Sequence, residues 1–378
     1  VLLREEIQLR NVTYAGFVEP GIGYIRLERF SRTAGDDIRR ALKDLKVNGS
    51  PRGLILDLRD NPGGLLEMAV DVVSKFVPES SLVVSTRGRR PDSERKYYSN
   101  EKPMLVEGPL AVLINRGSAS ASEIVAGALQ DLDRGIIVGT RSFGKGLVQT
   151  VTRLTENSSL KITTGRYYTP SGRSIQELDY LHRDSDGRAS VLPDSLRRQF
   201  RTAHNRPVFE GAGITPDATV DEAPRSRLFE ELNRKAMIFK FANRYVARRG
   251  ENAGPPAGRD VLLADFSAFL KEKEFAYQEE GELKLSELRT IAQERKYGGD
   301  FAKRLQDLGQ VLEAEKKKSL QVFDDAVRMS LEMEIIARLK GDRARIEAGF
   351  AGDRQLGAAI ALIKDPAAYD HLLLERRR

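Results

Sequence analysis

The chain has 378 residues, a hydrophobic fraction of 40% and a formal net charge of +7, proportions of an ordinary globular protein with two or three domains. It contains no Cys, which excludes a thiol nucleophile, disulfides and thiolate-bound zinc, and its three His residues are too scattered for a histidine metal site. Basic residues are interleaved with acidic ones, and no apolar run approaches the ~20 residues of a membrane span, so we expect neither nucleic acid nor a spanned membrane as a partner.

Residues 1–222 are predicted to form an α/β core. Short β-rich runs alternate there with helical stretches and Gly/Pro turns, a pattern typical of βαβ units and a largely parallel sheet. Antiparallel strands around 147–154 and 159–168 are expected to extend this sheet. The predicted strands are 23–27, 53–58, 82–86, 110–115 and 135–138, and the predicted helices are 36–45, 65–76 and 121–132.

Residues 223–378 are predicted to form a mostly α-helical C-terminal domain. A stretch rich in Pro and Gly, 250–258, predicts a break between helices. Further on, an apolar residue recurs every fourth position, which is typical of a core-facing or partner-facing helix. This stripe consists of Phe323, Val327, Leu331, Ile335 and Leu339.

Ser120 is a candidate nucleophile. The strand 110–115 runs through a short loop into a helix that begins at Ala121, so Ser120 is expected where the sheet meets a helix N-terminus. Unpaired N–H groups and the helix dipole favour negative charge there, and the amide of Ala121 could stabilise an oxyanion. Ser120 and Glu123 also fit the capping box S-x-x-E, and this segment alone favours capping.

Lys145, in the glycine-rich segment 139–146, is the second candidate. The segment begins like a phosphate-binding loop, but Gly146 replaces the Ser or Thr that would hold Mg²⁺, and a strand-like run follows instead of a helix. A lysine amine shielded from water gives up its charge more easily and can then act as a general base. If Lys145 begins a strand, the two-residue period puts Gln149 on its face, where the amide can orient the lysine. A solvated lysine in a glycine turn is the alternative that the residues alone favour.

Four motifs follow one another in the first domain. They are D-L-R-D-N-P-G-G at 57–64, S-A-S-A-S-E-I at 118–124, F-G-K-G at 143–146 and Y-T-P-S-G-R-S-I at 168–175. In combination, order and spacing they resemble the carboxyl-terminal processing proteases, the tail-specific Ser/Lys endopeptidases of peptidase family S41. The resemblance implies a ClpP/crotonase-like core sheet with flanking helices and no metal or cofactor.

The resemblance also implies roles for single residues. Ser120 would attack a peptide carbonyl and form an acyl-enzyme, with Lys145 as its base. The expected substrates are unfolded or tail-exposed polypeptides with apolar C-termini. The implied site consists of catalytic Ser120, Lys145 and Gln149, and of oxyanion donors Ala121 and Gly64 or Gly63.

The resemblance further implies export to the bacterial periplasm or cell envelope, with which the absence of Cys agrees. The chain opens at Val1 without a leader, so we expect that a signal peptide has been removed. In the family a PDZ domain precedes the strand that is expected here at 2–8. No such domain is recognised in this sequence, which leaves it either removed or never present.

Three alternatives remain beside an active protease. The first is a non-proteolytic binding or scaffold protein on the same fold, since fold alone does not fix function. The second is a latent protease that needs a partner to assemble its site. The third is an acyl-transfer enzyme related to the crotonases, which a lysine-activated serine disfavours. The helical domain is expected to mediate homodimerisation or adaptor docking.

Overall fold

The computed structural model of the chain describes residues 9–105, 107–183, 189–191, 197–222, 226–250, 258–321, 323 and 325–374. The chain divides into two compact units, one formed by residues 1–222 together with 353–378, the other by residues 223–352. All of 223–378 was predicted to be one helical domain, whereas residues 353–378 belong to the first unit. The strand expected at 2–8 lies outside the described residues.

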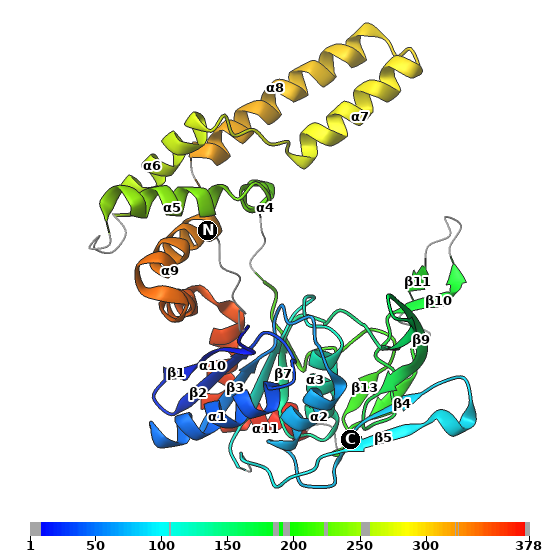
Figure 1. Ribbon diagram of the computed structural model, residues 1–378. Coiled ribbons are helices and arrows are strands. Elements are labelled where there is room, and N and C mark those ends of the chain that lie inside the picture. Colours follow the sequence, from blue (N-terminus) through cyan, green and yellow to red (C-terminus); the bar gives the residue numbers. More distant parts are fainter. Residues whose placement is uncertain are drawn as a thin grey trace. The chain divides into compact units, whose positions relative to one another are not determined.

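A six-stranded sheet forms the centre of the first unit (Figure 1). Its strands, in spatial order, are β1 (Val12–Glu19), β2 (Ile22–Leu27), β3 (Gly53–Asp57), β6 (Leu110–Ile114), β7 (Ile136–Gly139) and β14 (Ala218–Thr219). β1 is antiparallel to β2, and every other neighbouring pair is parallel. β3, β6 and β7 are buried along their whole length, and their nearly unbroken apolar sequences are typical of strands covered on both faces. The largely parallel core predicted from the sequence is therefore confirmed.

Helices connect the parallel strands and cover the sheet. Between strands lie α1 (Ala34–Val47), α2 (Leu66–Ser74) and α3 (Ala121–Asp131). From the end of the chain, α10 (Arg354–Lys364) and α11 (Pro366–Leu374) also pack on it. The hydroxyl of Tyr369 donates to the carbonyl of Leu110 and accepts from its N–H, both at 2.9 Å. These contacts explain why 353–378 belongs to the first unit.

A separate antiparallel sheet stands beside the core. Its strands, in spatial order, are β5 (Arg95–Tyr98), β4 (Leu82–Arg87), β9 (Ser158–Tyr168) and β8 (Leu147–Thr155). The prediction that β8 and β9 extend the core sheet is wrong. The sheet edge beside β7 is occupied by β14, which pairs Ala218 with Val138, and β9 pairs instead with β4. Two short hairpins complete the unit, β10 (Leu178–Arg183) with β11 (Ala189–Val191) and β12 (Gln199–Arg201) with β13 (Pro207–Phe209).

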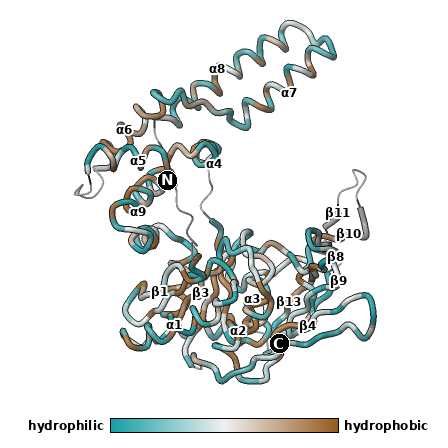
Figure 2. Tube along the Cα trace, in the orientation of Figure 1, coloured by the Kyte–Doolittle hydropathy of each residue, from teal (hydrophilic) through white to brown (hydrophobic). Residues whose placement is uncertain are grey.

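The second unit is helical. It contains α4 (Arg227–Arg234), α5 (Met237–Arg249), α6 (Arg259–Glu272), α7 (Glu280–Glu294), α8 (Gly299–Gln321) and α9 (Asp325–Gly349). The predicted apolar stripe packs into its core, with Phe323, Val327, Leu331 and Ile335 buried and Leu339 packed against them. The predicted break falls between α5 and α6, although 251–257 lie outside the described residues. α7 and α8 form an antiparallel hairpin along which apolar residues alternate with polar ones (Figures 1 and 2). None of the described helices is long and apolar enough to cross a membrane.

Candidate active site

Ser120 occupies the predicted turn between β6 and α3. It is the residue before the first turn of α3, with φ 56° and ψ −111°, and such a positive φ is uncommon for a residue with a side chain. Strained backbone of this kind persists only where the surroundings fix it, and it is concentrated at functional sites. The chain turns sharply here from strand to helix, which leaves Ser120 partly accessible between buried neighbours.

Side-chain hydrogen bonds fix the loop that carries Ser120. The hydroxyl of Ser118 accepts from the N–H of Asn115 at 3.0 Å and donates to the carbonyl of Leu58 at 2.8 Å. The Oδ1 of Asn115 accepts from the N–H of Gly117 at 2.9 Å. Both Asn115 and Ser118 are buried, so these bonds are shielded from competing water. The serine loop is thus tied to the end of β3.

Gly63 lies directly against this loop. A Cβ added to Gly63 would stand 2.6 Å from the carbonyl oxygen of Ala119 and 2.8 Å from the nitrogen of Ala121, so only glycine fits. Asn61 holds the two segments together, because its carbonyl accepts from the N–H of Ala119 at 3.0 Å and from the Ser122 hydroxyl at 2.9 Å. The structure therefore brings the N-P-G-G turn and the serine loop together.

The candidate oxyanion donors differ in their hydrogen bonding. The N–H of Gly63 donates to the Oδ1 of Asn61 at 2.9 Å. In the described part of the chain, the N–H groups of Gly64 and Ala121 have no hydrogen-bond acceptor. An oxyanion needs donors that are not already engaged, so this arrangement favours Gly64 over Gly63 as the partner of Ala121.

Glu123 joins the serine loop to the lysine loop. Its side chain is completely buried, and its Oε2 accepts from the N–H of Ser120 at 2.8 Å and from the N–H of Lys145 at 2.9 Å. Its Oε1 accepts from the Ser142 hydroxyl at 2.6 Å and from the Gly144 N–H at 2.7 Å. Burial raises the pKa of Glu123, and the four donors only partly oppose this. The sequence predicted no role for Glu123 except capping. The burial of every residue of α3, which distinguishes this carboxylate, is seen only in the structure.

Lys145 and Gln149 lie on the exposed side of this arrangement. Both residues are exposed, Lys145 in the loop before β8 and Gln149 within β8. No hydrogen bond joins the Lys145 ammonium to the Ser120 hydroxyl in the described residues. Gln149 and Gly64 line one cavity of about 600 Å³ between the N-terminus of α2 and the separate sheet. The structure therefore brings the Ser120 and Lys145 backbones together through Glu123, while no hydrogen bond joins their side chains in the described residues.

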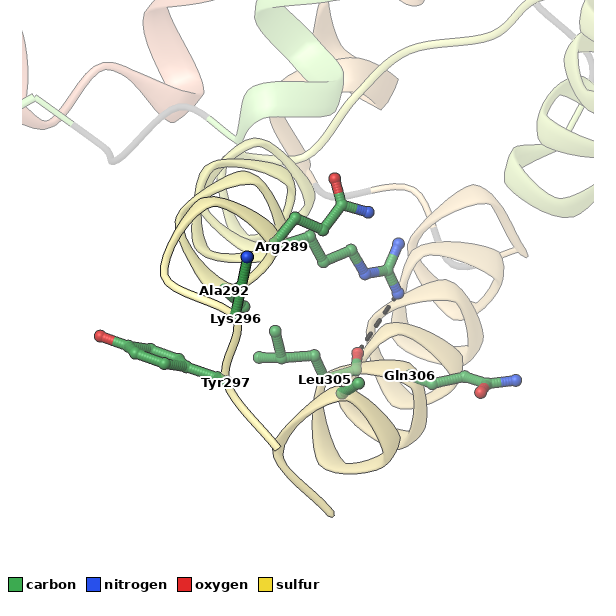
Figure 3. Close-up of a pocket in the computed structure, with 8 residues that line it drawn as sticks. Arg289, Ala292, Lys296, Tyr297, Leu305 and Gln306 are labelled. Atoms are coloured by element: carbon green, nitrogen blue, oxygen red, sulfur yellow. Dashed lines mark hydrogen bonds between the residues drawn. The ribbon is translucent and has the colours of Figure 1, made fainter. Parts of the chain in front are cut away.

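Other features offer less chemistry. In the described residues, no cluster of three or more His, Asp or Glu side chains could hold a metal ion. A cavity of about 550 Å³ lies between α7 and α8 (Figure 3), where the Arg289 guanidinium donates to the carbonyl of Leu305 at 3.3 Å. Its lining contains no serine, threonine or carboxylate. The region around Ser120 is therefore the candidate active site.

Two family models match this chain, one in each of its two halves. Residues 21–182 match the family model of peptidase family S41, and residues 228–363 match that of a probable PDZ-protease C-terminal helical domain. The carboxy-terminal-processing protease of Bartonella bacilliformis is 47% identical over 178 residues, which are 46% of this chain and 40% of the relative. The carboxyl-terminal-processing protease of a Synechocystis species is 37% identical over 199 residues, 53% of this chain and 42% of the relative.

Among solved structures, the photosystem II D1 C-terminal processing protease is 31% identical, with a TM-score of 0.42, and the match covers 58% of this chain and 50% of that one. The present chain spans less than half the length of the two curated relatives described above. The matches confirm the family resemblance carried by the four motifs.

Proposed function

Because residues 21–182 match the family model of peptidase family S41, we propose that this chain is a serine endopeptidase that works through Ser120 and Lys145. One observation carries the proposal. Ser120 lies on a strained turn that Gly63 approaches closely, and the N–H groups of Ala121 and of Gly64, the residue after Gly63, have no acceptor in the described residues. Acyl transfer by a serine uses a nucleophile, oxyanion donors and a general base, and this arrangement supplies candidates for the first two.

The proposed reaction has two halves. The Oγ of Ser120 attacks the carbonyl carbon of the scissile bond and passes its proton to the neutral amine of Lys145. The N–H groups of Ala121 and Gly64 stabilise the oxyanion, and Lys145 returns the proton to the leaving amine. A water molecule, deprotonated by Lys145, then attacks the carbonyl carbon of the acyl-enzyme; the bond to the Ser120 Oγ breaks, Lys145 returns the proton to that oxygen, and the second product leaves as a carboxylic acid. Gln149 orients Lys145 through its side-chain amide.

A latent form of the same enzyme is the second candidate. It is favoured by the exposure of Lys145 and by the absence of a hydrogen bond to Ser120 among the described residues. The serine proton can pass to the lysine amine only across a hydrogen bond between the two side chains. Substrate or a partner would complete the site by covering Lys145. A non-proteolytic scaffold would need no such covering.

The proposed substrates are unfolded or tail-exposed polypeptides with apolar C-termini, processed in the bacterial periplasm or cell envelope. The cavity that Gln149 and Gly64 share is wide enough, at about 600 Å³, for an extended segment of a polypeptide. The relatives named above carry C-terminal processing in their names, which supports the substrate class.

The helical unit is proposed to bind a second copy of the chain through the hairpin of α7 and α8. These helices pack where Leu285 approaches Gly309. At 100° per residue, the exposed Leu288 and Ile291 of α7 lie to one side of that seam. The exposed Leu308 and Val311 of α8 lie to the same side, because the two helices run in opposite directions. Residues 280–321 carry nearly equal numbers of interleaved acidic and basic residues, which suits a self-complementary partner better than a highly charged one.

The test uses a loosely folded polypeptide that ends in small apolar residues, with fragments followed by mass spectrometry. Cleavage by the parent, and by neither Ser120→Ala nor Lys145→Ala, is the expected result. Cleavage that persists in Ser120→Ala would reject the nucleophile. If the parent does not cleave the polypeptide, a PDZ domain from a relative is added. A latent enzyme then becomes active, whereas a scaffold does not.

A further inference from the structure

We propose that Glu222 and Asp353 are positioning residues for the N-P-G-G turn at 61–64, called the oxyanion turn below. They are the residues at which the chain leaves the core for the helical unit and returns from it. The inference rests on the proposed protease function. Both residues belong to the first unit, and the helical unit 223–352 is inserted between them. Asp353 accepts hydrogen bonds from Arg59, which lies just before the oxyanion turn. Glu222 accepts from Asn115, whose side chain also binds Asp60.

Asp353 clamps Arg59. Its Oδ1 and Oδ2 accept from the two terminal nitrogens of the Arg59 guanidinium at 2.9 and 2.6 Å, and Oδ1 also accepts from the N–H of Leu356 at 3.0 Å. The carboxylate therefore caps α10 and binds Arg59 at the same time. A two-point arginine–carboxylate contact fixes orientation as well as distance.

Asp57 holds Arg59 from the other side. Its Oδ1 accepts from the Arg59 Nε at 3.0 Å and its Oδ2 from a terminal nitrogen at 2.6 Å. The Tyr24 hydroxyl donates to the same Oδ2 at 2.6 Å. Burial disfavours the charge of Arg59, but Asp57 and Asp353 outweigh it and raise its pKa. Arg59 is therefore charged and fixed in orientation. Asp57, at the end of β3, holds it on one side, and Asp353, before α10, holds it on the other.

Glu222 acts on the same segment through Asn115. The Nδ2 of Asn115 donates to the Oε1 of Glu222 at 2.8 Å and to the Oδ1 of Asp60 at 3.0 Å. The Oδ1 of Asn115 accepts from the N–H of Asp60 at 2.9 Å. A Cβ added to Gly117 would stand 2.7 Å from the Cα of Asp60, so the serine loop and the oxyanion turn touch here. Glu222 thus orients the amide that ties the two loops together.

The two connections therefore converge on adjacent residues, Arg59 and Asp60, a few residues before Gly64. Catalysis by backbone amides depends on their position to a fraction of an ångström, and a shift of about 1 Å can cost about 100-fold in rate. Misplaced oxyanion donors weaken binding of the transition state more than binding of the substrate. Loss of either contact is expected to lower kcat while KM changes little.

The experiment compares steady-state cleavage by the full chain and by Asp353→Asn, in which Asn preserves the helix cap but removes the charge that binds Arg59. We expect kcat to fall about 10-fold, with KM within about twofold of the parent. Lys364→Ala, on the same helix and paired with half-buried Glu19 at 2.8 Å, is the matched control and should retain the parent kcat. Glu222→Ala should lower kcat, and Glu222→Gln, which keeps an acceptor for Asn115, should restore it.

An activity-independent readout separates this inference from the proposed function. Hydrogen exchange of peptides covering 59–66 should be faster in Asp353→Asn than in the parent, whether or not the parent cleaves substrate. Unchanged exchange together with an unchanged kcat would overturn the inference, as would a rate loss that equals the unfolded fraction measured by circular dichroism. A parent that cleaves nothing even with an added PDZ domain, but whose exchange responds as expected, would refute the protease and leave the positioning role standing.

Discussion

The backbone N–H groups of Ser120 and Lys145 donate to the same oxygen, the Oε2 of Glu123, at 2.8 and 2.9 Å. The proposed nucleophile and the proposed base come from different loops, one before α3 and one before β8. A single buried carboxylate therefore sets the separation of their backbones. The proposed dyad also requires a hydrogen bond between the Lys145 and Ser120 side chains, which the described residues do not form.

Replacing Glu123 with Gln is expected to separate the two loops. Glutamine has one acceptor oxygen where the carboxylate has two, so its NH₂ group would face donors from the backbone. We expect kcat/KM to fall about 100-fold and the free energy of unfolding to fall by about 2–3 kcal/mol. Urea unfolding and cleavage assays measure both. Glu107→Gln, the same change at an exposed residue, should alter neither quantity, and an unimpaired Glu123→Gln enzyme would contradict the coupling.

Gly63→Ala is expected to damage the oxyanion turn. Gly63 has φ 96°, and the new methyl group would press on the Ala119 carbonyl and the Ala121 nitrogen. We expect a loss of about 1–3 kcal/mol in stability and of about 100-fold in kcat/KM. The matched control is Gly357→Ala in α10, where nothing lies within 4 Å of the added Cβ. That change should stabilise the helix by about 0.5–1 kcal/mol and preserve cleavage. Equal effects of the two substitutions would mean that the close approach at Gly63 is not important.

Much of the core could be predicted from the sequence, because its signals are local. Apolar runs of strand length and helical periodicity located five strands and three helices within a few residues of their ends. The proposed catalytic and oxyanion residues came from motif resemblance, and their roles remain predictions.

The features that the sequence did not predict depend on pairing between distant segments. The sequence shows the Glu123 cap but not the loop 142–145, which folds back onto its carboxylate. Arg59 and Asp353 are 294 positions apart, a separation at which no periodic pattern exists. The pairing of β9 with β4 was missed for the same reason.

Asp57 is expected to make the protein sensitive to acid. Complete burial would raise the pKa of Asp57, but the charges of Arg59 and Arg26 and the hydrogen bonds from Arg59 and Tyr24 lower it. Between this lowered pKa and the unfolded value of about 3.9, the unfolded chain binds more protons than the folded one. The stability that Asp57 contributes is therefore complete above about pH 4 and is lost as the pH falls through the folded pKa.

The measurement is the free energy of unfolding in urea between pH 2.5 and 6. The fall in stability toward acid should be shallower in Asp57→Asn than in the parent. Asp217 provides the control with opposite sign, because burial raises its folded pKa above the unfolded value despite Arg206. The contribution of Asp217 to the free energy of unfolding becomes less favourable as the pH rises. Stability should therefore fall more steeply toward acid in Asp217→Asn than in the parent. Parallel curves for all three proteins would show that neither carboxylate is linked to folding in this range.

The hairpin of α7 and α8 is expected to hold two copies of the chain together. Ile291 and Leu308 are 45% and 46% exposed, and they lie on the same side of the hairpin. Introducing lysine at both positions would bury two charges in the proposed interface, so Ile291→Lys/Leu308→Lys should be monomeric where the parent is dimeric. Sedimentation equilibrium over a range of concentrations measures this. Gln293→Lys/Gln306→Lys adds the same charge at the cavity on the other side of the seam (Figure 3) and should stay dimeric. A parent that is monomeric at every concentration would reject self-association, and a control that dissociates equally would show that net charge, not the apolar face, decides assembly.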